Sequence, residues 1–509
     1  MIDTNALRKK VLDLAIRGKL VPQNPNDEPA SILLERIREE KQRLIREGKI
    51  KKDKVDSVIF RGDDNCHYEK IGNNEPVLLE DLPFEIPESW TWVRLGDIGD
   101  WGAGATPNRN ISAYYGGNIP WLKTGELNNS FVYDSEEKIT EIALKNCSLR
   151  YNRIGDILIA MYGATIGKLA IAGVELTTNQ ACCACTPFSG IYNFYLFEFL
   201  KASKDRLIEL GKGGAQPNIS REKIVNYLFP LPPYDEQIRI VKELQRIMQY
   251  IELLEKNQNE YADLVEVLKK AILQSAIQGT LVEQCESDEP ASVLLERIRD
   301  EKRKQLGKKY VESYIYKGDD NRYYEKIGTK EPILLENLPF EIPSSWSWAR
   351  LGTLIDFSKS ITVKVNEIEE DDWVLDLEDI EKDTGKVIIK KTMLETKSKS
   401  DKHKFFAGNV LYSKLRPYLN KVLIADEDGY CTTEILAFDF GKYILNHYAR
   451  YFLMSSYFLE YATNGALGDM PRIRSTLGNN GLIPIPPYNE QIRICNRIKQ
   501  IFDSIKDEV

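Results

Sequence analysis

Residues 60–96, FRGDDNCHYEKIGNNEPVLLEDLPFEIPESWTWVRLG, return at 316–352 as YKGDDNRYYEKIGTKEPILLENLPFEIPSSWSWARLG. Two further stretches repeat at a similar offset: residues 15–41 match 276–302, and PLPPYDEQIRI at 230–240 matches PIPPYNEQIRI at 484–494. The 509-residue chain is therefore a tandem duplication with a period of about 255 residues. Solenoid repeats run roughly 20 to 50 residues, so this period indicates two copies of a multi-part unit.

Composition excludes several classes of protein. Charged residues make up 29% and apolar residues 42%, which is typical of folded soluble domains. No apolar run has the length of a membrane helix and no secretory leader opens the chain, so we expect a cytoplasmic protein without membrane contact. The eight cysteines, including Cys182, Cys183 and Cys185, lack zinc-site spacing, so we expect buried thiols and no metal.

The net charge of −8 does not exclude a nucleic-acid partner. Residues 93–230 and 349–484 are nearly neutral, and most of the negative charge lies in the other segments. Because the local placement of Lys and Arg decides phosphate contact, these two blocks can still bind DNA. They are also where similarity between the repeats fades, which indicates related folds with different surfaces. Short strands, polar loops and a helical stretch over 194–210 predict an α+β fold for them.

The frame around these blocks reads as helix. After Pro232 and Pro233, Asp235 is the expected N-cap of a helix over 235–277, about 64 Å long, with Gly279 as the stop. Apolar residues at alternating steps of three and four predict a seam that packs on another helix. The seam comprises Leu244, Ile247, Ile251, Leu254, Gln258, Tyr261, Val265, Leu268 and Ile272.

The second copy of this helix is divided between the two ends of the chain. Ile498, Ile501 and Ile505 align with the start of the seam, and residues 6–12 align with 267–273. We therefore expect a circular organisation, in which the terminal helices adjoin and pair antiparallel with the central helix about a pseudo-twofold axis. Each copy also carries a charged helical arm, after Pro29 and Pro290, whose single apolar edge suits either protein docking or simple solvation.

These patterns divide the chain into seven segments. They are an N-terminal helix (1–20), a helical arm with a Pro-rich linker (21–92), a first variable domain (93–230), the central long helix (231–280), a second arm and linker (281–348), a second variable domain (349–484) and a C-terminal helix (485–509). The expected fold class is α+β, with two domains of mixed strands and helices separated by long antiparallel helices of coiled-coil type.

Polar, basic and aromatic side chains in the two blocks have the donors and acceptors needed for phosphates and base edges. In the first block the candidates for DNA contact are Thr106, Arg109, Tyr115, Lys123, Thr165, Lys168, Gln180, Gln216 and Asn218. In the second block they are Lys359, Lys414, Arg416, Tyr418, Lys421, Arg472 and Arg474.

Catalytic motifs are weak. The two Pro-Pro-Tyr runs are like the Asn-Pro-Pro-Tyr loop of adenine-N6 methyltransferases, but Leu231 and Ile485 stand where that loop has Asn. Without the polar side chain nothing there accepts hydrogen bonds from a target amine, so each run is better interpreted as the start of a helix. The three histidines, His67, His403 and His447, have no acid or base partner nearby in sequence. We expect no catalytic residue in this chain.

Several motifs together resemble a known family. They are GATIGK at 163–168, GAQPNIS at 214–220, KLRPYL at 414–419 and the two EQIRI runs. With two variable domains and a circularly closed pair of long helices, the chain resembles the specificity subunit of bacterial type I restriction-modification systems. One departure is that the simplest family members begin directly with a recognition domain, whereas about 90 residues come first here.

The resemblance implies a function for each part. Each variable block would be a target recognition domain that reads one half of a bipartite double-stranded DNA sequence. The helices would set the gap between halves and bind two modification subunits, which hold S-adenosylmethionine and methylate adenine. Restriction (translocase and nuclease) subunits can join, and this chain would hold no cofactor. Two alternatives remain open: a self-contained adenine-N6 DNA methyltransferase, and a protein-binding helical scaffold without DNA affinity.

Overall fold

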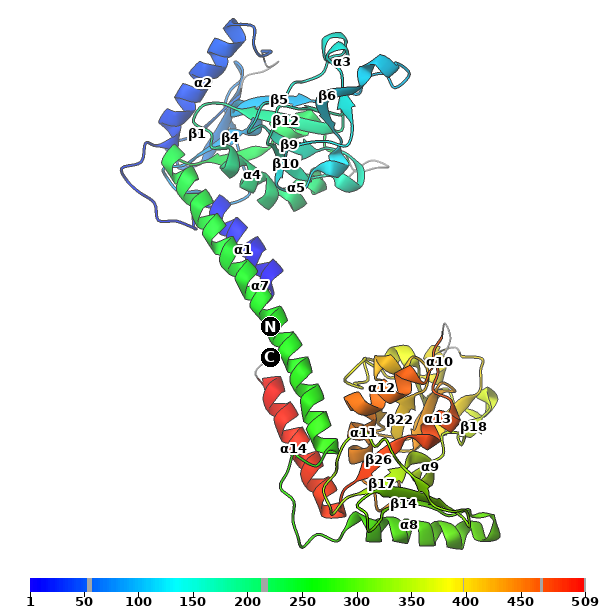
Figure 1. The fold of residues 1–509 in the computed structure, drawn as a ribbon. Helices are drawn as coiled ribbons and strands as arrows, with labels where there is room; N and C mark the ends of the chain where they lie inside the picture. Colours follow the sequence, from blue (N-terminus) through cyan, green and yellow to red (C-terminus); the bar gives the residue numbers. More distant parts are fainter. Residues whose placement is uncertain (53–56, 212–217, 397, 467–469, 508–509) are drawn as a thin grey trace. The chain divides into compact units, whose positions relative to one another are not determined.

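The computed structural model describes residues 1–509 except 53–56, 212–217, 397, 467–469 and 508–509 (Figure 1). It divides into two compact units, Met1–Gln258 and Asn259–Val509. Both units mix helices and strands, as the α+β prediction requires.

The described residues of unit 1 form helices at both ends and four sheets between them. Its helices are α1 (Thr4–Ile16), α2 (Ala30–Arg46), α3 (Glu141–Asn146), α4 (Asn193–Ala202), α5 (Lys204–Leu210), α6 (Arg221–Val225) and the first part of α7 (Tyr234–Ile277). Its strands are β1 (Ser57–Arg61), β2 (His67–Ile71), β3 (Val77–Leu78), β4 (Thr91–Arg94), β5 (Gly99–Ala103), β6 (Tyr115–Leu122), β7 (Phe131–Val132), β8 (Lys138–Ile139), β9 (Ile157–Ala160), β10 (Leu169–Ala172), β11 (Thr177–Thr178), β12 (Cys182–Pro187) and β13 (Leu228–Leu231). The largest sheet has the order β5-β12-β9-β10-β7, beside sheets β1-β2-β3, β11-β6-β8 and β13-β4.

Unit 2 repeats the plan. Its helices after α7 are α8 (Ala291–Leu306), α9 (Leu351–Leu354), α10 (Met393–Thr396), α11 (Asn446–Met454), α12 (Ser456–Asn464), α13 (Ser475–Asn480) and α14 (Tyr488–Asp507). Its strands are β14 (Ser313–Lys317), β15 (Tyr323–Ile327), β16 (Ile333–Leu334), β17 (Ser347–Arg350), β18 (Ile361–Val363), β19 (Trp373–Leu375), β20 (Lys391–Thr392), β21 (Lys402–Phe405), β22 (Val410–Ser413), β23 (Val422–Ile424), β24 (Gly429–Thr432), β25 (Ile435–Phe438) and β26 (Leu482–Ile485). The sheets are β14-β15-β16, β17-β26, β18-β21-β24-β19-β20 and β23-β22-β25.

Helix α7 begins directly after the two prolines, so the interpretation of Pro-Pro-Tyr as a helix start is confirmed. The predicted N-cap, Asp235, is wrong by two residues, because the helix already begins at Tyr234 and Asp235 lies in its first turn. There its carboxylate complements the unpaired amides of the helix start. The predicted stop is confirmed, since α7 ends at Ile277 and Gly279 has a φ of +73°, in the left-handed region that glycine tolerates best.

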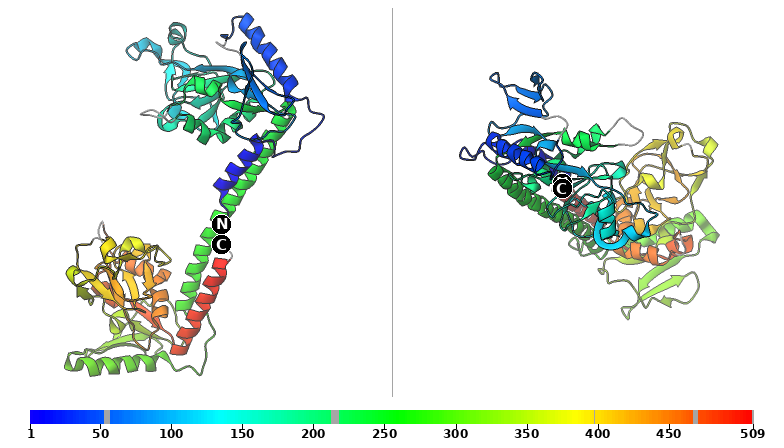
Figure 2. Two further views of the ribbon diagram at one scale, coloured as in Figure 1. Left: turned by 180° about the vertical axis from the view of Figure 1, so that it is seen from behind. Right: turned by 90° about the horizontal axis from the view of Figure 1, so that it is seen from above.

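In unit 1, α1 runs antiparallel to α7, as Figures 1 and 2 show. Gln258, the one polar member of the seam, accepts a hydrogen bond from the backbone of Ile2 (2.7 Å) and donates one back to it (3.2 Å). One end of α1 lies near Glu255 of α7, which pairs with Arg8 at 2.6 Å. Antiparallel pairing with the central helix is therefore confirmed here.

In unit 2, α14 takes the place of α1 (Figures 1 and 2). Its Ile494 and Ile498 are fully buried in one cluster with Ile272 and Ile277 of α7. The terminal helices α1 and α14 belong to different units. Their expected contact with one another stays a prediction. The seven proposed segment boundaries likewise stay predictions.

The seam is less continuous than predicted. Leu244, Ile251 and Ile272 are buried, but Tyr261 is 38% and Leu268 47% exposed. The reason is that the apolar residues of this helix cover a broad face, which also includes the exposed Leu264 and Val267. One partner helix covers only part of that face.

Three other expectations need correction. The stretch 194–210 is two helices, α4 and α5, which break at Ser203. The arm α2 is not a free amphipathic helix, because its Leu33 and Ile37 are buried in the core of unit 1. The small sheets β1-β2-β3 and β14-β15-β16 were not predicted; they occupy the segments expected to be arm and linker.

Candidate nucleic-acid interface

The candidate residues of unit 1 gather at one edge of its largest sheet. In the antiparallel register, Cys183 of β12 faces Ala103 at the end of β5, and Cys182 faces Ala160 at the end of β9. The loops that follow β5 and β9 and precede β12 must therefore emerge together. We call this region edge 1, comprising residues 104–109, 123, 137, 162–168, 179–181 and 218.

Arg109 is held in place by an aromatic platform. Its guanidinium carbon lies 4.7 Å from the ring centre of Tyr115 and 5.0 Å from that of Trp121. The indole nitrogen of Trp121 donates to the carbonyl of Ala105 (3.0 Å), which fixes the platform to edge 1. Cation–π contacts of this kind orient a cation before any ligand arrives.

One carboxylate holds two of the predicted cations. Glu137 accepts hydrogen bonds from Arg109 (2.5 Å) and also pairs with Lys123. These two partners hold the pKa of the Glu137 carboxyl below its ordinary value. The structure thus brings Arg109, Tyr115 and Lys123 together, with both cations paired to the same acid.

The remaining candidates of unit 1 lie on the loop after β9 and on its neighbours. A β-bridge between Tyr162 and Asn218 places Asn218 beside the short 3-10 turn Gly163–Thr165. The Thr165 hydroxyl donates to the Tyr162 carbonyl (3.1 Å), and Lys168 closes the loop. Thr106 and Gln180 are exposed on the two adjoining loops, and Gln216 lies outside the described residues.

Unit 2 presents a corresponding edge. In its register Ser413 at the end of β22 faces Ile435 at the start of β25, and Tyr412 faces Val422 at the start of β23. A bridge between Leu415 and Arg472 brings the segment before α13 alongside. We call this region edge 2, comprising residues 414–421, 434 and 471–474. It contains six of the seven candidates: Lys414, Arg416, Tyr418, Lys421, Arg472 and Arg474.

Cations at edge 2 differ in their availability. Arg472 pairs with Glu434 (2.9 Å), whereas the ammonium of Lys421 points inward and donates to the carbonyl of Leu377 (2.6 Å). Burial lowers the pKa of Lys421. Lys359 does not join this group, because it lies near Lys302 of the arm helix α8. Burial lowers the pKa of Lys302, and the positive charge of Lys359 lowers it further.

Comparison with known proteins gives these edges a context. A family described as the type I restriction modification DNA specificity domain matches residues 87–261, which include all of edge 1. The chain is 27% identical to the EcoAI type I restriction enzyme specificity subunit of Escherichia coli, over 98% of this chain and 91% of that protein. It is 29% identical to the EcoEI specificity subunit of the same species, over 69% of this chain and 61% of that protein.

Residues 87–261 thus match the specificity-domain family, and nearly the whole chain is similar to a type I restriction enzyme specificity subunit. A solved chain from a study of complex assembly and conformational transition of the type I R-M system shares its fold. That match has a TM-score of 0.50 at 15% identity and covers 84% of this chain and 93% of the other.

The two edges are built on one backbone plan. Strands β9, β10 and β12 of unit 1 pair as β22, β23 and β25 do in unit 2. Gly163 and Gly167 have positive φ in the first loop, and Arg416 (φ +50°) and Asn420 (φ +49°) have positive φ in the second. A left-handed arginine costs roughly 1–2 kcal/mol, and such strain in a well-determined fold is typical of functional positions.

Sequence reasoning missed three residues of the edges: Glu137, Glu434 and Tyr162. The two acids were overlooked because a search for phosphate contacts selects cations, and their pairing only becomes visible in the fold. Tyr162, 38% exposed, had a usable signal, because it ends an apolar strand and directly precedes the Gly-Thr-Lys loop.

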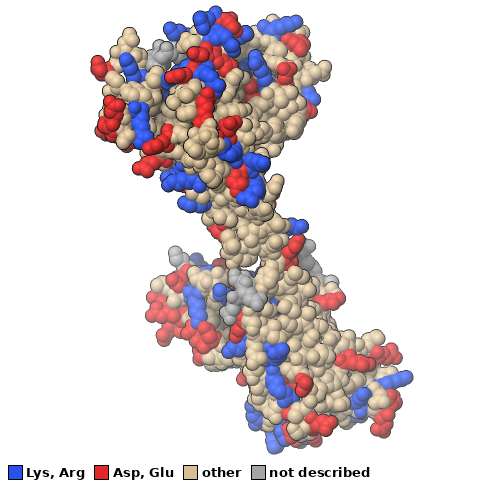
Figure 3. All heavy atoms as spheres, turned by 90° about the vertical axis from the view of Figure 1, so that its left-hand side faces the viewer, with Lys and Arg blue, Asp and Glu red and all other residues tan. Residues whose placement is uncertain are grey.

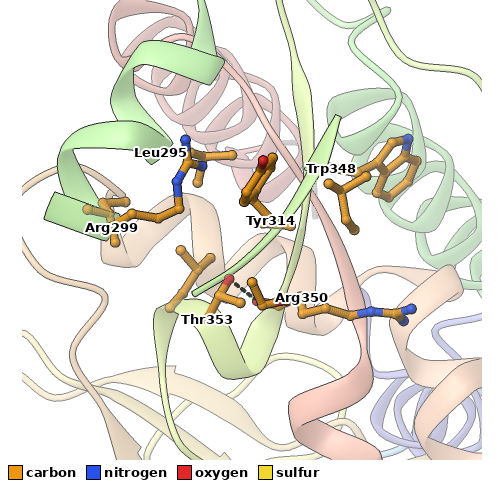
Figure 4. Close-up of a pocket in the computed structure, with 11 residues that line it drawn as sticks. Leu295, Arg299, Tyr314, Trp348, Arg350 and Thr353 are labelled. Atoms are coloured by element: carbon orange, nitrogen blue, oxygen red, sulfur yellow. Dashed lines mark hydrogen bonds between the residues drawn. The ribbon is translucent and has the colours of Figure 1, made fainter. Parts of the chain in front are cut away.

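A hollow in unit 2 lies away from edge 2, against the arm helix. Leu295 and Arg299 of α8, Tyr314 of β14 and Arg350 of β17 line it (Figure 4). The hydroxyl of Thr353 donates to the Arg350 carbonyl at its wall (2.6 Å). Its free volume of about 20 Å³ accommodates a water molecule but not a cofactor.

Charge of both signs is mixed on one face of the molecule. On the face drawn in Figure 3, Lys and Arg alternate with Asp and Glu.

Within the described part of the chain, no three His, Cys, Asp or Glu side chains gather as a metal site would require. No described helix combines the length and the apolar character needed to cross a membrane. The three cysteines of β12 are buried, and burial raises the pKa of Cys183 to about 12.

Proposed function

We propose that this chain is the DNA-reading subunit of a type I restriction-modification complex in the cytoplasm. Edge 1 and edge 2 each read one half of a bipartite target in double-stranded DNA. Helix α7 and its partner helices set the distance between the halves and dock two methyltransferase subunits, and restriction subunits can join them. Methylation, cleavage and the binding of S-adenosylmethionine belong to those partners.

The observation that carries the proposal is the matched pair of edges. The same strand arrangement supports both, yet edge 1 presents Arg109, Lys123 and Lys168, and edge 2 presents Lys414, Arg416 and Arg472. The side chains that contact base edges determine which sequence is read, so two edges with the same strands and different side chains can read different half-sites. Duplication followed by divergence at the edges produces this arrangement.

The exposed apolar face of α7 supports a docking role. Leu264 (67%), Val267 (63%) and Leu268 (47%) are exposed in unit 2 although α14 packs on the same helix. Protein interfaces bury side chains of this kind at their centre. A helix with one apolar side occupied and another exposed is suited to binding a further subunit.

The Pro-Pro-Tyr runs support a non-catalytic role. Leu231, which stands in place of the methyltransferase asparagine, is fully buried at the end of β13, and Tyr234 is already helical. The peptide is therefore used to start a helix and presents no acceptor to a target base.

The test is a methylation map of DNA from cells that express this chain with its modification subunit. Exchanging residues 97–228 for the matching block of another specificity subunit should change one half of the methylated sequence and leave the other half and the gap intact. A map in which both halves change would refute the assignment of one half to each edge.

A point variant provides the matched control for the exchange. Arg416→Ala at edge 2 should weaken methylation of the wild-type site without changing the half read by edge 1. Methyl transfer by the purified chain alone would contradict the non-catalytic role. A wild-type complex that retains no DNA even at low salt would contradict DNA reading.

A further inference from the structure

The small sheet of unit 1 exposes an apolar outer face. Phe60 of β1 faces Tyr68 of β2, and Tyr68 faces Leu78 of β3, so all three project to the same side. The opposite side carries Ile59 and Glu69, which are 5% and 7% exposed. Phe60 and Leu78 are 39% and 41% exposed, and the rings of Phe60 and Tyr68 are stacked at 6.0 Å.

Unit 2 repeats this face. Tyr316 of β14 faces Tyr324 of β15, which faces Leu334 of β16. The two tyrosine rings are stacked at 5.9 Å, and Tyr316 is 38% exposed. Residues 57–78, SVIFRGDDNCHYEKIGNNEPVL, and 313–334, SYIYKGDDNRYYEKIGTKEPIL, are nearly the same sequence, in contrast to the divergent edges. We call these surfaces outer face 1 (Phe60, Tyr68, Leu78) and outer face 2 (Tyr316, Tyr324, Leu334).

Each outer face is held rigidly on its unit. Arg94 of β4 forms a paired contact with Glu69 on the inner side of the first sheet (2.6 and 3.0 Å). Arg350 of β17 contacts Glu325 in the same way, at 2.7 Å in the second sheet. A surface fixed before binding loses little conformational entropy when a partner arrives, so these faces are prepared to bind.

The side chains indicate a protein partner. Among the outward positions each face adds one cation, Lys70 on face 1 and Lys326 on face 2, whereas DNA binding depends on several Lys and Arg contacts to phosphates. Aromatic and aliphatic side chains with little charge are the composition of a protein–protein interface core.

Duplication specifies the kind of partner. Two faces with the same side chains bind the same molecule twice. A second copy of this chain does not fit, because two self-associating faces on every chain would join chains into open-ended assemblies. A partner with one complementary patch gives a closed complex of one chain with two partner subunits.

We propose that outer faces 1 and 2 are docking surfaces for the two modification subunits, one on each face, in addition to the exposed side of α7. This assignment rests on the proposed function. It explains why the sheets that sequence analysis took as linkers remain alike while the edges diverge: both must fit the same protein.

The test uses the full chain expressed with its modification subunit and weighed by native mass spectrometry. The variants are Phe60→Thr with Leu78→Thr for face 1, Tyr316→Thr with Leu334→Thr for face 2, and all four together. Threonine keeps β propensity while it removes the apolar contact. The control changes two exposed isoleucines elsewhere in unit 1, Ile142→Thr with Ile154→Thr.

We expect a 1:2 complex for the wild type and the control, a 1:1 complex for each two-site variant, and the free chain for the fourfold variant. At subunit concentrations near the dissociation constant, affinity should fall at least tenfold for each altered face. The melting temperature of each variant, measured alone, shows that the fold is intact.

The proposal is overturned if the fourfold variant still binds two modification subunits with wild-type affinity. It is also overturned if the substitutions dissolve self-association of the chain, or if they abolish DNA retention while the 1:2 complex persists. A wild-type chain that binds no modification subunit at all would instead contradict the proposed function.

Discussion

Glu137 restrains the cations of edge 1, and its removal has a calculable effect on DNA binding. In the free protein the Glu137 carboxylate pairs with Arg109 and Lys123. A phosphate that approaches Arg109 must therefore compete with an acid already in contact. Glu137→Gln keeps the shape of the side chain but removes the charge, so we expect tighter binding of DNA without the target sequence.

The magnitude follows from counterion release. Each additional phosphate contact steepens the dependence of log affinity on log salt by about 0.9. Since one negative charge is removed, we count one additional effective contact. The ratio of variant to wild-type affinity is then about eightfold higher at 0.1 M salt, and about twofold higher at 0.5 M, than the same ratio at 1 M.

The assay is fluorescence anisotropy of a labelled duplex without the target, titrated with the assembled complex over a range of salt. Glu136→Gln is the control, because it removes the same charge from an exposed neighbour with no ion-pair contact shown in the structure. A steeper slope for Glu137→Gln alone is the expected result. Equal slopes for the two variants would refute the idea that Glu137 restrains phosphate contacts.

Three further changes test other parts of the structure. Leu244→Ala, at a buried seam position, should lower the free energy of unfolding by about 2–5 kcal/mol, and Leu268→Ala by under about 1, in denaturant titrations. Arg416→Gly should change stability by no more than about 1 kcal/mol, because relief of the left-handed strain offsets the added freedom of the unfolded chain, yet weaken DNA binding in anisotropy titrations. A hydrogen bond from Arg493 lowers the pKa of Asp288, so this carboxylate stabilises the fold above its ordinary pKa of 3.8, and the effect is lost as pH falls through its lowered value; Asp288→Asn should cost about 1–2 kcal/mol at pH 7 and progressively less below pH 3.8 in thermal unfolding.

The long helices could be predicted because their signals are local or repeated. Helix α7 is predicted by the prolines before it, by the spacing of its apolar residues and by Gly279 after it. Exposure along the helix could not be predicted, since periodicity shows which side chains share a face and not how much of that face a partner covers. Tyr261 and Leu268 fit the seam and are nevertheless exposed.

The site was predicted by residue type and only partly by arrangement. Loops rich in Arg, Lys and Tyr were chosen for their chemistry, and strand pairing then gathered most of the chosen residues at two edges. Lys359 fell outside because nothing local distinguishes a loop at an edge from a loop beside the arm helix. Glu137 was missed because it lies far along the chain from Arg109, and the pairing depends on the fold of strands β6 and β8.

The two loops after β9 and β22 show how one fold can acquire a new specificity. Both loops reverse through left-handed residues at matching positions, which fixes the backbone path. Where the first uses Gly163, which has no side chain to offer a base, the second places Arg416, and where the first uses Gly167 the second uses Asn420. Because the path is set by strand pairing and by one bridge in each unit, a costly left-handed arginine can replace glycine without changing the sheet. The left-handed backbone at Arg416 is therefore less stable than it would be with glycine, and in return it places a guanidinium at this position of the loop.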